Sequence, residues 1–71
     1  MTDLRALTWT DLAEAFCQAE DRLKTARKAG DTEAVVDAMR TVVRTEAEMD
    51  RRIALYGSAG AARAADREAK K

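Results

Sequence analysis

The sequence has no histidine, no proline and a single cysteine, Cys17, among its 71 residues. One cysteine cannot form a disulfide within the chain, and without histidine or a second thiolate only carboxylates remain as metal ligands. A chain of this length buries only about 60% of the surface that its unfolded form exposes, so a monomer has a small margin of stability. Because an internal disulfide is impossible and a zinc site is nearly excluded, association with another chain is the reinforcement that we expect.

Net charge and long apolar stretches are also absent. The 13 basic residues balance the 13 acidic ones, which argues against a strong field for nucleic acid or for a membrane surface. The chain has no stretch of about 18 apolar residues that would span a bilayer. The first nine residues, MTDLRALTW, lack the apolar core of a secretion signal. We therefore expect a soluble protein located in the cytoplasm, a reducing compartment that suits an unpaired cysteine.

Alanine, glutamate, lysine and arginine dominate the chain instead, and this composition is typical of helices. A first helix is predicted over residues 9–29. Thr8 can cap its beginning, and Gly30 follows its last residue as a stop. The apolar residues of this segment recur every three or four positions on one narrow face: Trp9, Leu12, Phe16, Ala19, Leu23 and Ala26.

A second helix is predicted over residues 32–56, with Asp31 or Thr32 as its cap and Gly57 as its stop. So few connecting residues force the second helix to fold back on the first, which predicts an antiparallel hairpin. Its main stripe has the same spacing as that of the first helix: Val35, Met39, Val42, Glu46, Met49, Ile53 and Tyr56.

The remaining residues, 58–71, offer no apolar side chain larger than alanine. We expect them to form a short Ala-rich helix or a frayed tail that adds nothing to the core. The chain is thus predicted to be all-α, with a helical hairpin in residues 1–57 and an Ala-rich charged tail in residues 58–71.

Glu46 is a carboxylate near the centre of the second helix's apolar stripe, at about 100° per residue. Three interpretations remain open. It sets the register of the protein's own bundle as a polar layer, at some cost in stability. It receives an arginine from a different protein. Or it lies at a loosely packed, wet layer and extends its carboxylate to water.

A second apolar edge runs beside the main stripe. Two helices offer each other only one seam, so this edge is expected to meet a second copy or a larger protein. Two hairpins packed together would form a four-helix bundle with a coiled-coil-like core, that is, a homodimer. The predicted protein interface consists of Val36, Val43, Glu46, Ala47 and Asp50 on the second helix, with Ala13 and Cys17 on the first.

Catalytic chemistry has little support in the sequence. Without histidine, with Ser58 as the only serine and with no glycine-rich phosphate loop, no catalytic triad or phosphate site can be assembled. Cys17 has no cationic neighbour one turn away and is interpreted as a small buried hydrophobic residue. We therefore expect no enzymatic activity, no catalytic residue, no metal, no cofactor and no small-molecule substrate.

Arginines on the outer side of the second helix suggest the alternative function, a dimeric helical protein that binds nucleic acid. Acidic residues share that side, and the pairs Asp37–Arg40, Arg44–Glu48 and Glu48–Arg52 lie one turn apart, where they are expected to neutralise one another. The sequence therefore favours a non-enzymatic module for protein–protein interaction, such as a regulator, an inhibitor or a minor component of an assembly. The candidate nucleic-acid contacts are Arg40, Arg44 and Arg51, with Arg63 and Arg67 in the tail.

Overall fold

The structure, a computed structural model, describes residues 3–69. A short 3-10 helix, η1 (Leu4–Ala6), precedes three α-helices: α1 (Trp9–Ala29), α2 (Thr32–Tyr56) and α3 (Ala59–Ala69). Every regular element in this part of the chain is helical, which confirms the all-α prediction. The bounds of α1 and α2 are those predicted from the caps and stops.

Local side-chain and backbone chemistry fixes the ends of the long helices. Thr8 caps α1 by accepting a hydrogen bond from the backbone N–H of Asp11 at 3.1 Å. Asp31 caps α2 in the same way through the N–H of Ala34, also at 3.1 Å. Between them Gly30 has a φ of 70°, a left-handed conformation that glycine adopts without steric cost.

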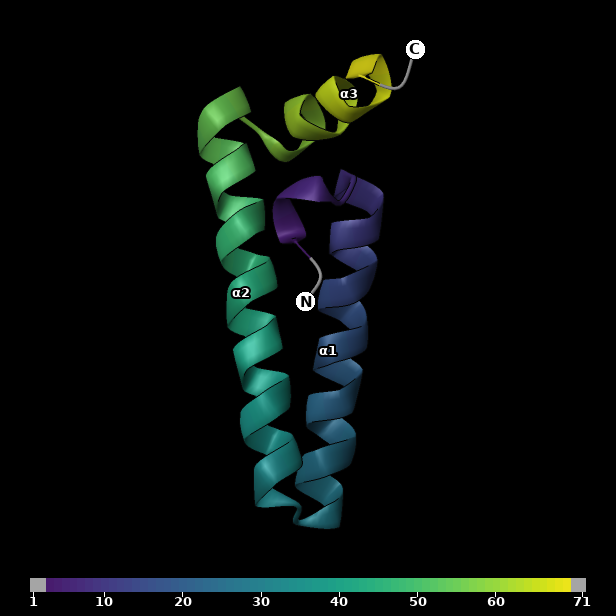
Figure 1. The fold of residues 1–71 in the computed structure, drawn as a ribbon, viewed down its shortest axis with the longest axis vertical. Helices are drawn as coiled ribbons and strands as arrows, with labels where there is room; N and C mark the ends of the chain where they lie inside the picture. Colours follow the sequence, from purple (N-terminus) through teal and green to yellow (C-terminus); the bar gives the residue numbers. More distant parts are fainter. Residues whose placement is uncertain (1–2, 70–71) are drawn as a thin grey trace.

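This tight connection makes α1 and α2 run side by side in opposite directions (Figure 1). The molecule is accordingly elongated, with extents of 44 × 21 × 17 Å. The core between the helices is thin. Its buried apolar members are small apart from one leucine: Leu12, Ala19 and Ala26 from α1 and Ala38 from α2. Trp9, Phe16 and Leu23 are half-buried along the same face of α1, as its spacing predicts.

α3 lies across the open end of the α1–α2 pair, next to the beginning of α1 and the end of α2 (Figure 1). Gly57, with a φ of 94°, ends α2. The Ser58 hydroxyl oxygen then accepts a hydrogen bond from the backbone N–H of Ala61 in the first turn of α3. Ala62 of α3 is only 1% exposed. The expectation that the tail adds nothing to the core is therefore wrong, because an alanine is small enough to let α3 approach closely.

No helix in the described part of the chain is long and apolar enough to cross a membrane.

Candidate functional site

The face of α2 that packs against α1 is rotated from the predicted one. Ala38, Thr45 and Arg52, spaced seven residues apart, are buried, whereas Glu46 is exposed. Thr45 is fully buried, and its hydroxyl hydrogen-bonds to two backbone carbonyls of α2 at 2.8 and 3.0 Å. The prediction that Glu46 occupies a layer between the two helices is therefore wrong.

Side-chain size accounts for this rotation. Ala38 and Thr45 are small, so α2 comes close to α1 along their line, and the threonine hydroxyl finds its partners within its own helix. The apolar pattern placed the larger Met39 in this seam, but Met39 is 46% exposed. Counting apolar residues thus gave the correct helix and the wrong centre of its buried face.

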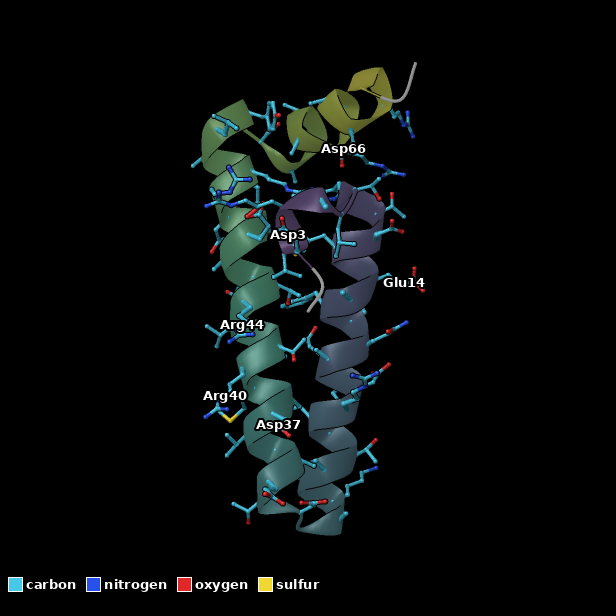
Figure 2. All side chains as sticks on the ribbon, in the orientation of Figure 1. Asp3, Glu14, Asp37, Arg40, Arg44 and Asp66 are labelled. Carbon is cyan, nitrogen blue, oxygen red and sulfur yellow. The ribbon has the colours of Figure 1, made fainter. Side chains whose placement is uncertain are left out.

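The rotation leaves large apolar side chains uncovered on the outer side of α2. Val36, Met39 and Val43 are 42%, 46% and 63% exposed. Together with Arg40 and Arg44 they line a shallow hollow of about 370 Å³. Figure 2 shows both arginines on the side of α2 away from α1. This surface, named here the outer face of α2, is the candidate docking site.

The other predicted interface residues divide between two helices. Ala47 and Asp50 are exposed on α2, beside the outer face, and Glu46 is exposed as well. On α1, Ala13 is half-buried. Cys17 is exposed, so its interpretation as a buried hydrophobic residue is wrong. At 100° per residue it lies about 160° from buried Ala19, on the side of α1 away from α2. The assignment of all these residues to a protein interface stays a prediction.

The arginines of the outer face lack the acidic partners that the sequence suggested. Within residues 3–69, no ion pair joins Asp37 to Arg40 or Arg44 to Glu48. Glu48 was placed on the exposed side of α2, yet it is only 7% exposed. It forms the predicted ion pair with Arg52 and, in addition, a pair with Arg51. The prediction is thus confirmed for the Glu48–Arg52 pair and wrong for Asp37–Arg40 and Arg44–Glu48, because the rotation of α2 carries Glu48 inward and away from Arg44.

Arg51 and Arg52 hold the Glu48 carboxylate from two directions. Arg51 donates through Nε to Glu48 Oε2 at 2.8 Å and through Nη2 to Oε1 at 2.6 Å, a two-pronged geometry that strengthens the pair. Arg52 donates through Nε to Oε1 at 3.1 Å. These hydrogen bonds, that from Arg51 first, lower the pKa of Glu48 from its usual 4.5 to about 2, although burial alone would raise it. The same contact raises the pKa of Arg51.

Arg52 also ties the N-terminal segment to α2. It is 5% exposed, and its Nη2 donates to the carbonyls of Leu4, Arg5 and Leu7 at 2.9, 3.3 and 2.7 Å. The Leu4 carbonyl also accepts the N–H of Leu7 at 3.2 Å, whereas Arg5 and Leu7 lie at the end of η1, where carbonyls lack helical partners. The buried guanidinium therefore holds a segment that has no large buried side chain of its own.

Asp66 extends the same polar cluster to α3. It points from α3 toward the beginning of α1 (Figure 2), where its carboxylate accepts the backbone N–H of Trp9. The carboxylate also lies 3.7 Å from Nη1 of Arg52. An acidic group at a helix N-terminus is stabilised by the free N–H groups and the helix dipole. Glu48, Arg52 and Asp66, named here the polar knot, thus join all four helical elements.

A groove of about 520 Å³ runs between α1 and α2 toward the Gly30 turn. Alanines and threonines form most of its walls, with Asp21, Arg22, Asp31 and Asp37 at its edges. It exists because the small side chains that bring the helices together leave space beside the seam. Among the described residues, no group of three acidic or thiol side chains is placed to hold a metal ion.

The predicted nucleic-acid contacts are not gathered into one patch. Arg63 and Arg67 are exposed on α3, at the opposite end of the molecule from the Gly30 turn, whereas Arg40 and Arg44 lie on the half of α2 nearer that turn (Figures 1 and 2). Arg51 is engaged by Glu48. The last two basic residues of the tail, 70 and 71, lie outside the described residues.

Comparison with known proteins adds no relative: no protein-family model, no curated protein and no solved structure matches this chain.

Proposed function

We propose that the protein is a non-enzymatic interaction module that docks the outer face of α2 on another protein chain. The observation that carries this proposal is the contiguous exposure of Val36, Met39 and Val43. Single exposed apolar residues are ordinary, but a contiguous apolar surface rimmed by charged side chains is typical of a binding site. Removing apolar surface from water contributes about 25 cal/mol of favourable free energy per Å² buried.

The outer face lies on a regular helix whose two ends are fixed. α2 is capped by Asp31 and stopped by Gly57, and the polar knot fixes its C-terminal half against η1 and α3. A helix that is already ordered loses little conformational entropy when it binds. The outer face is therefore suited to a partner that presents a helix or another firm apolar surface, as in helix-to-helix recognition.

A matched pair of variants tests the proposal. We expect the unmodified protein to self-associate or to bind one particular protein in cell extract. Val43→Glu should abolish that binding, because it places a charge at the centre of the apolar surface. Gln18→Glu adds the same charge on the exposed side of α1 and should leave it intact. Binding that survives Val43→Glu, or a chain that neither self-associates nor retains any protein, would contradict the proposal.

Nucleic-acid binding stays as the second candidate because Arg40 and Arg44 are exposed and have no acidic partner among the described residues. With a net charge of zero, this function predicts weak attraction that falls steeply with salt. A mobility-shift assay at physiological salt distinguishes the two candidates. Tight binding that is lost in an Arg40→Gln, Arg44→Gln double variant would favour the nucleic-acid function.

A further inference from the structure

A narrow line of six exposed residues follows the side of α2 opposite its buried face. The line comprises Val36, Arg40, Val43, Ala47, Asp50 and Ala54, and it is named here the outer stripe. Its spacings are four, three, four, three and four residues, the repeat of a helix that packs on another helix in a coiled coil. The buried residues Ala38, Thr45 and Arg52 lie about 180° away at 100° per residue, so α1 does not cover the stripe.

The outer stripe is complementary to its own reversed copy. Its spacing reads the same in both directions and is centred on position 45. Reversal about that centre brings Val36 opposite Ala54, Val43 opposite Ala47 and Arg40 opposite Asp50. Each large apolar side chain thus meets a small one, and the basic residue meets the acidic one.

We propose that the outer stripe binds a second copy of this chain, with the two α2 helices antiparallel about a two-fold axis at the level of position 45. This inference rests on the proposed function and names its partner. A two-fold axis makes every contact occur twice, so Arg40 of each copy would pair with Asp50 of the other. Each valine of one copy would pack beside an alanine of the other, and the alanines let the two backbones come close.

Charge decides the orientation. If two copies packed with their α2 helices parallel and in register, each residue of the stripe would face its own equivalent. Arg40 would then lie against Arg40 and Asp50 against Asp50, and like charges at an interface cost binding energy. The antiparallel arrangement replaces both repulsions by attractions. Arg40 and Asp50 therefore select the direction of packing, while the valines and alanines supply the apolar contact.

The assembly differs from a closed four-helix bundle. Because the stripe lies on the side of α2 away from α1, the two α2 helices form the centre and each α1 lies outside, so that the four helices make a row. The stripe is about 27 Å long, from the 1.5 Å rise per residue of a helix. Such a narrow interface is at the small end of specific contacts, and we expect a dissociation constant on the order of 10–100 micromolar.

Charge reversal tests the proposal on the full chain by analytical ultracentrifugation at concentrations up to about a millimolar, above the expected dissociation constant. Arg40→Asp and Asp50→Arg should each weaken dimerisation by roughly tenfold or more, because each places two like-charged pairs in the dimer. The double variant carrying both changes should return to within about threefold of the unmodified protein. An equimolar mixture of the two single variants should form a heterodimer, since each then supplies the charge that the other lacks.

Two control variants alter net charge by the same amounts away from the stripe. Lys24→Asp and Glu14→Arg change exposed residues of α1, and Figure 2 shows Glu14 directed away from α2. Neither should change the dissociation constant by more than about twofold. Circular dichroism checks that all variants keep their helix content. We expect this because every substituted position is exposed. Loss of dimerisation in the controls would assign the effect to net charge and overturn the proposal.

The remaining outcomes separate this inference from the proposed function. A chain that stays monomeric at a millimolar concentration, yet binds a different protein through Val43, overturns the second-copy inference and leaves the interaction module intact. A dimer that is unaffected by both charge reversals overturns the antiparallel stripe. A chain with no partner of either kind overturns both.

Discussion

Arg52 and Val43 lie nine residues apart on α2, and each has surroundings that are the reverse of what its side chain favours. Arg52 is 5% exposed, whereas Val43 is 63% exposed. The arginine is buried where partner atoms are available: the Glu48 carboxylate, three backbone carbonyls and Asp66. The valine is exposed where α1 does not reach.

The difference separates the part of α2 that stabilises the fold from the part that the proposed function assigns to binding. In the polar knot, charged groups add to the small apolar core at the open end of the helix pair, to which α3 contributes the small Ala62. On the outer face of α2, apolar groups remain without a partner within the described chain. The four predictions that follow break the polar knot or test the rotation of α2 that creates this difference, from the largest expected effect to the smallest.

Replacing Arg52 with Met should have the largest effect on the fold. The change removes one of the two guanidinium groups that compensate buried Glu48 and takes a donor from three backbone carbonyls, so we expect the free energy of unfolding to fall by about 3–5 kcal/mol. Urea unfolding followed by circular dichroism measures this. Arg44→Met is the matched control, because Arg44 is exposed and should change stability by no more than about 0.5 kcal/mol. Equal effects at the two positions would mean that the knot does not stabilise the fold.

Glu48→Gln should lower stability by about 1.5–3 kcal/mol at neutral pH, since it weakens hydrogen bonds to two guanidinium groups. The folded pKa of Glu48, about 2, lies below its usual 4.5. Its contribution is therefore complete above about pH 4.5 and is lost as the pH falls toward 2. Unfolding curves between pH 2 and 6 should show this loss in the unmodified protein and in the exposed-site control Glu46→Gln, but much less in Glu48→Gln. A parallel pH dependence in all three proteins would assign acid sensitivity to other carboxylates.

Asp66→Ala should loosen the attachment of α3 and lower the free energy of unfolding by about 1 kcal/mol, the usual contribution of one capping hydrogen bond. Asp66 holds the Trp9 N–H and lies near Arg52, so its loss should speed hydrogen exchange at Trp9 and throughout α3. Arg67→Ala, at the next and exposed position, should leave exchange unchanged. Unaltered protection of the Trp9 amide in Asp66→Ala would show that this contact is not formed in solution.

Glu46→Leu should have the smallest effect on stability of the variants considered, and Thr45→Glu, at the neighbouring position, is its comparison. Glu46→Leu should change the free energy of unfolding by no more than about 0.5 kcal/mol, because the residue is exposed. Thr45→Glu, which puts a carboxylate at the fully buried position, should cost several times more. Thermal unfolding of the two variants checks this. The opposite ranking would restore Glu46 to the seam between the helices.

The sequence predicted the helices well because their ends depend on local chemistry. Thr8, Asp31, Gly30 and Gly57 act within a turn of their own positions, so each end can be recognised without knowledge of the rest of the fold. The apolar face of α1 was also predicted, because its apolar residues form a single narrow line and only that line can pack against α2. These features needed no information about distant contacts.

The rotation of α2 and the polar knot could not be predicted in the same way. The apolar arc of α2 is wider than one seam, so its pattern alone does not select between the line through Ala38 and Thr45 and the line through Met39 and Glu46. Close packing of small side chains makes that selection. The pair of Arg52 with Glu48, one turn away, was predicted. Its other partners come from residues 4–7 and from Asp66, up to 48 positions away in sequence, and only the folded chain brings them together.

The contrast between the two sides of α2 can be measured directly by recording amide NMR spectra of the full chain over a concentration series up to about a millimolar. Self-association through the outer stripe predicts shift changes centred on Val36, Val43 and Ala47, with Ala38 and Thr45 unchanged. Changes centred on Ala38 and Thr45 would instead mean that the seam between α1 and α2 opens and that these helices exchange partners. That result, or spectra that do not change with concentration, would contradict the account of α2 as one helix with a closed inner side and a self-binding outer side.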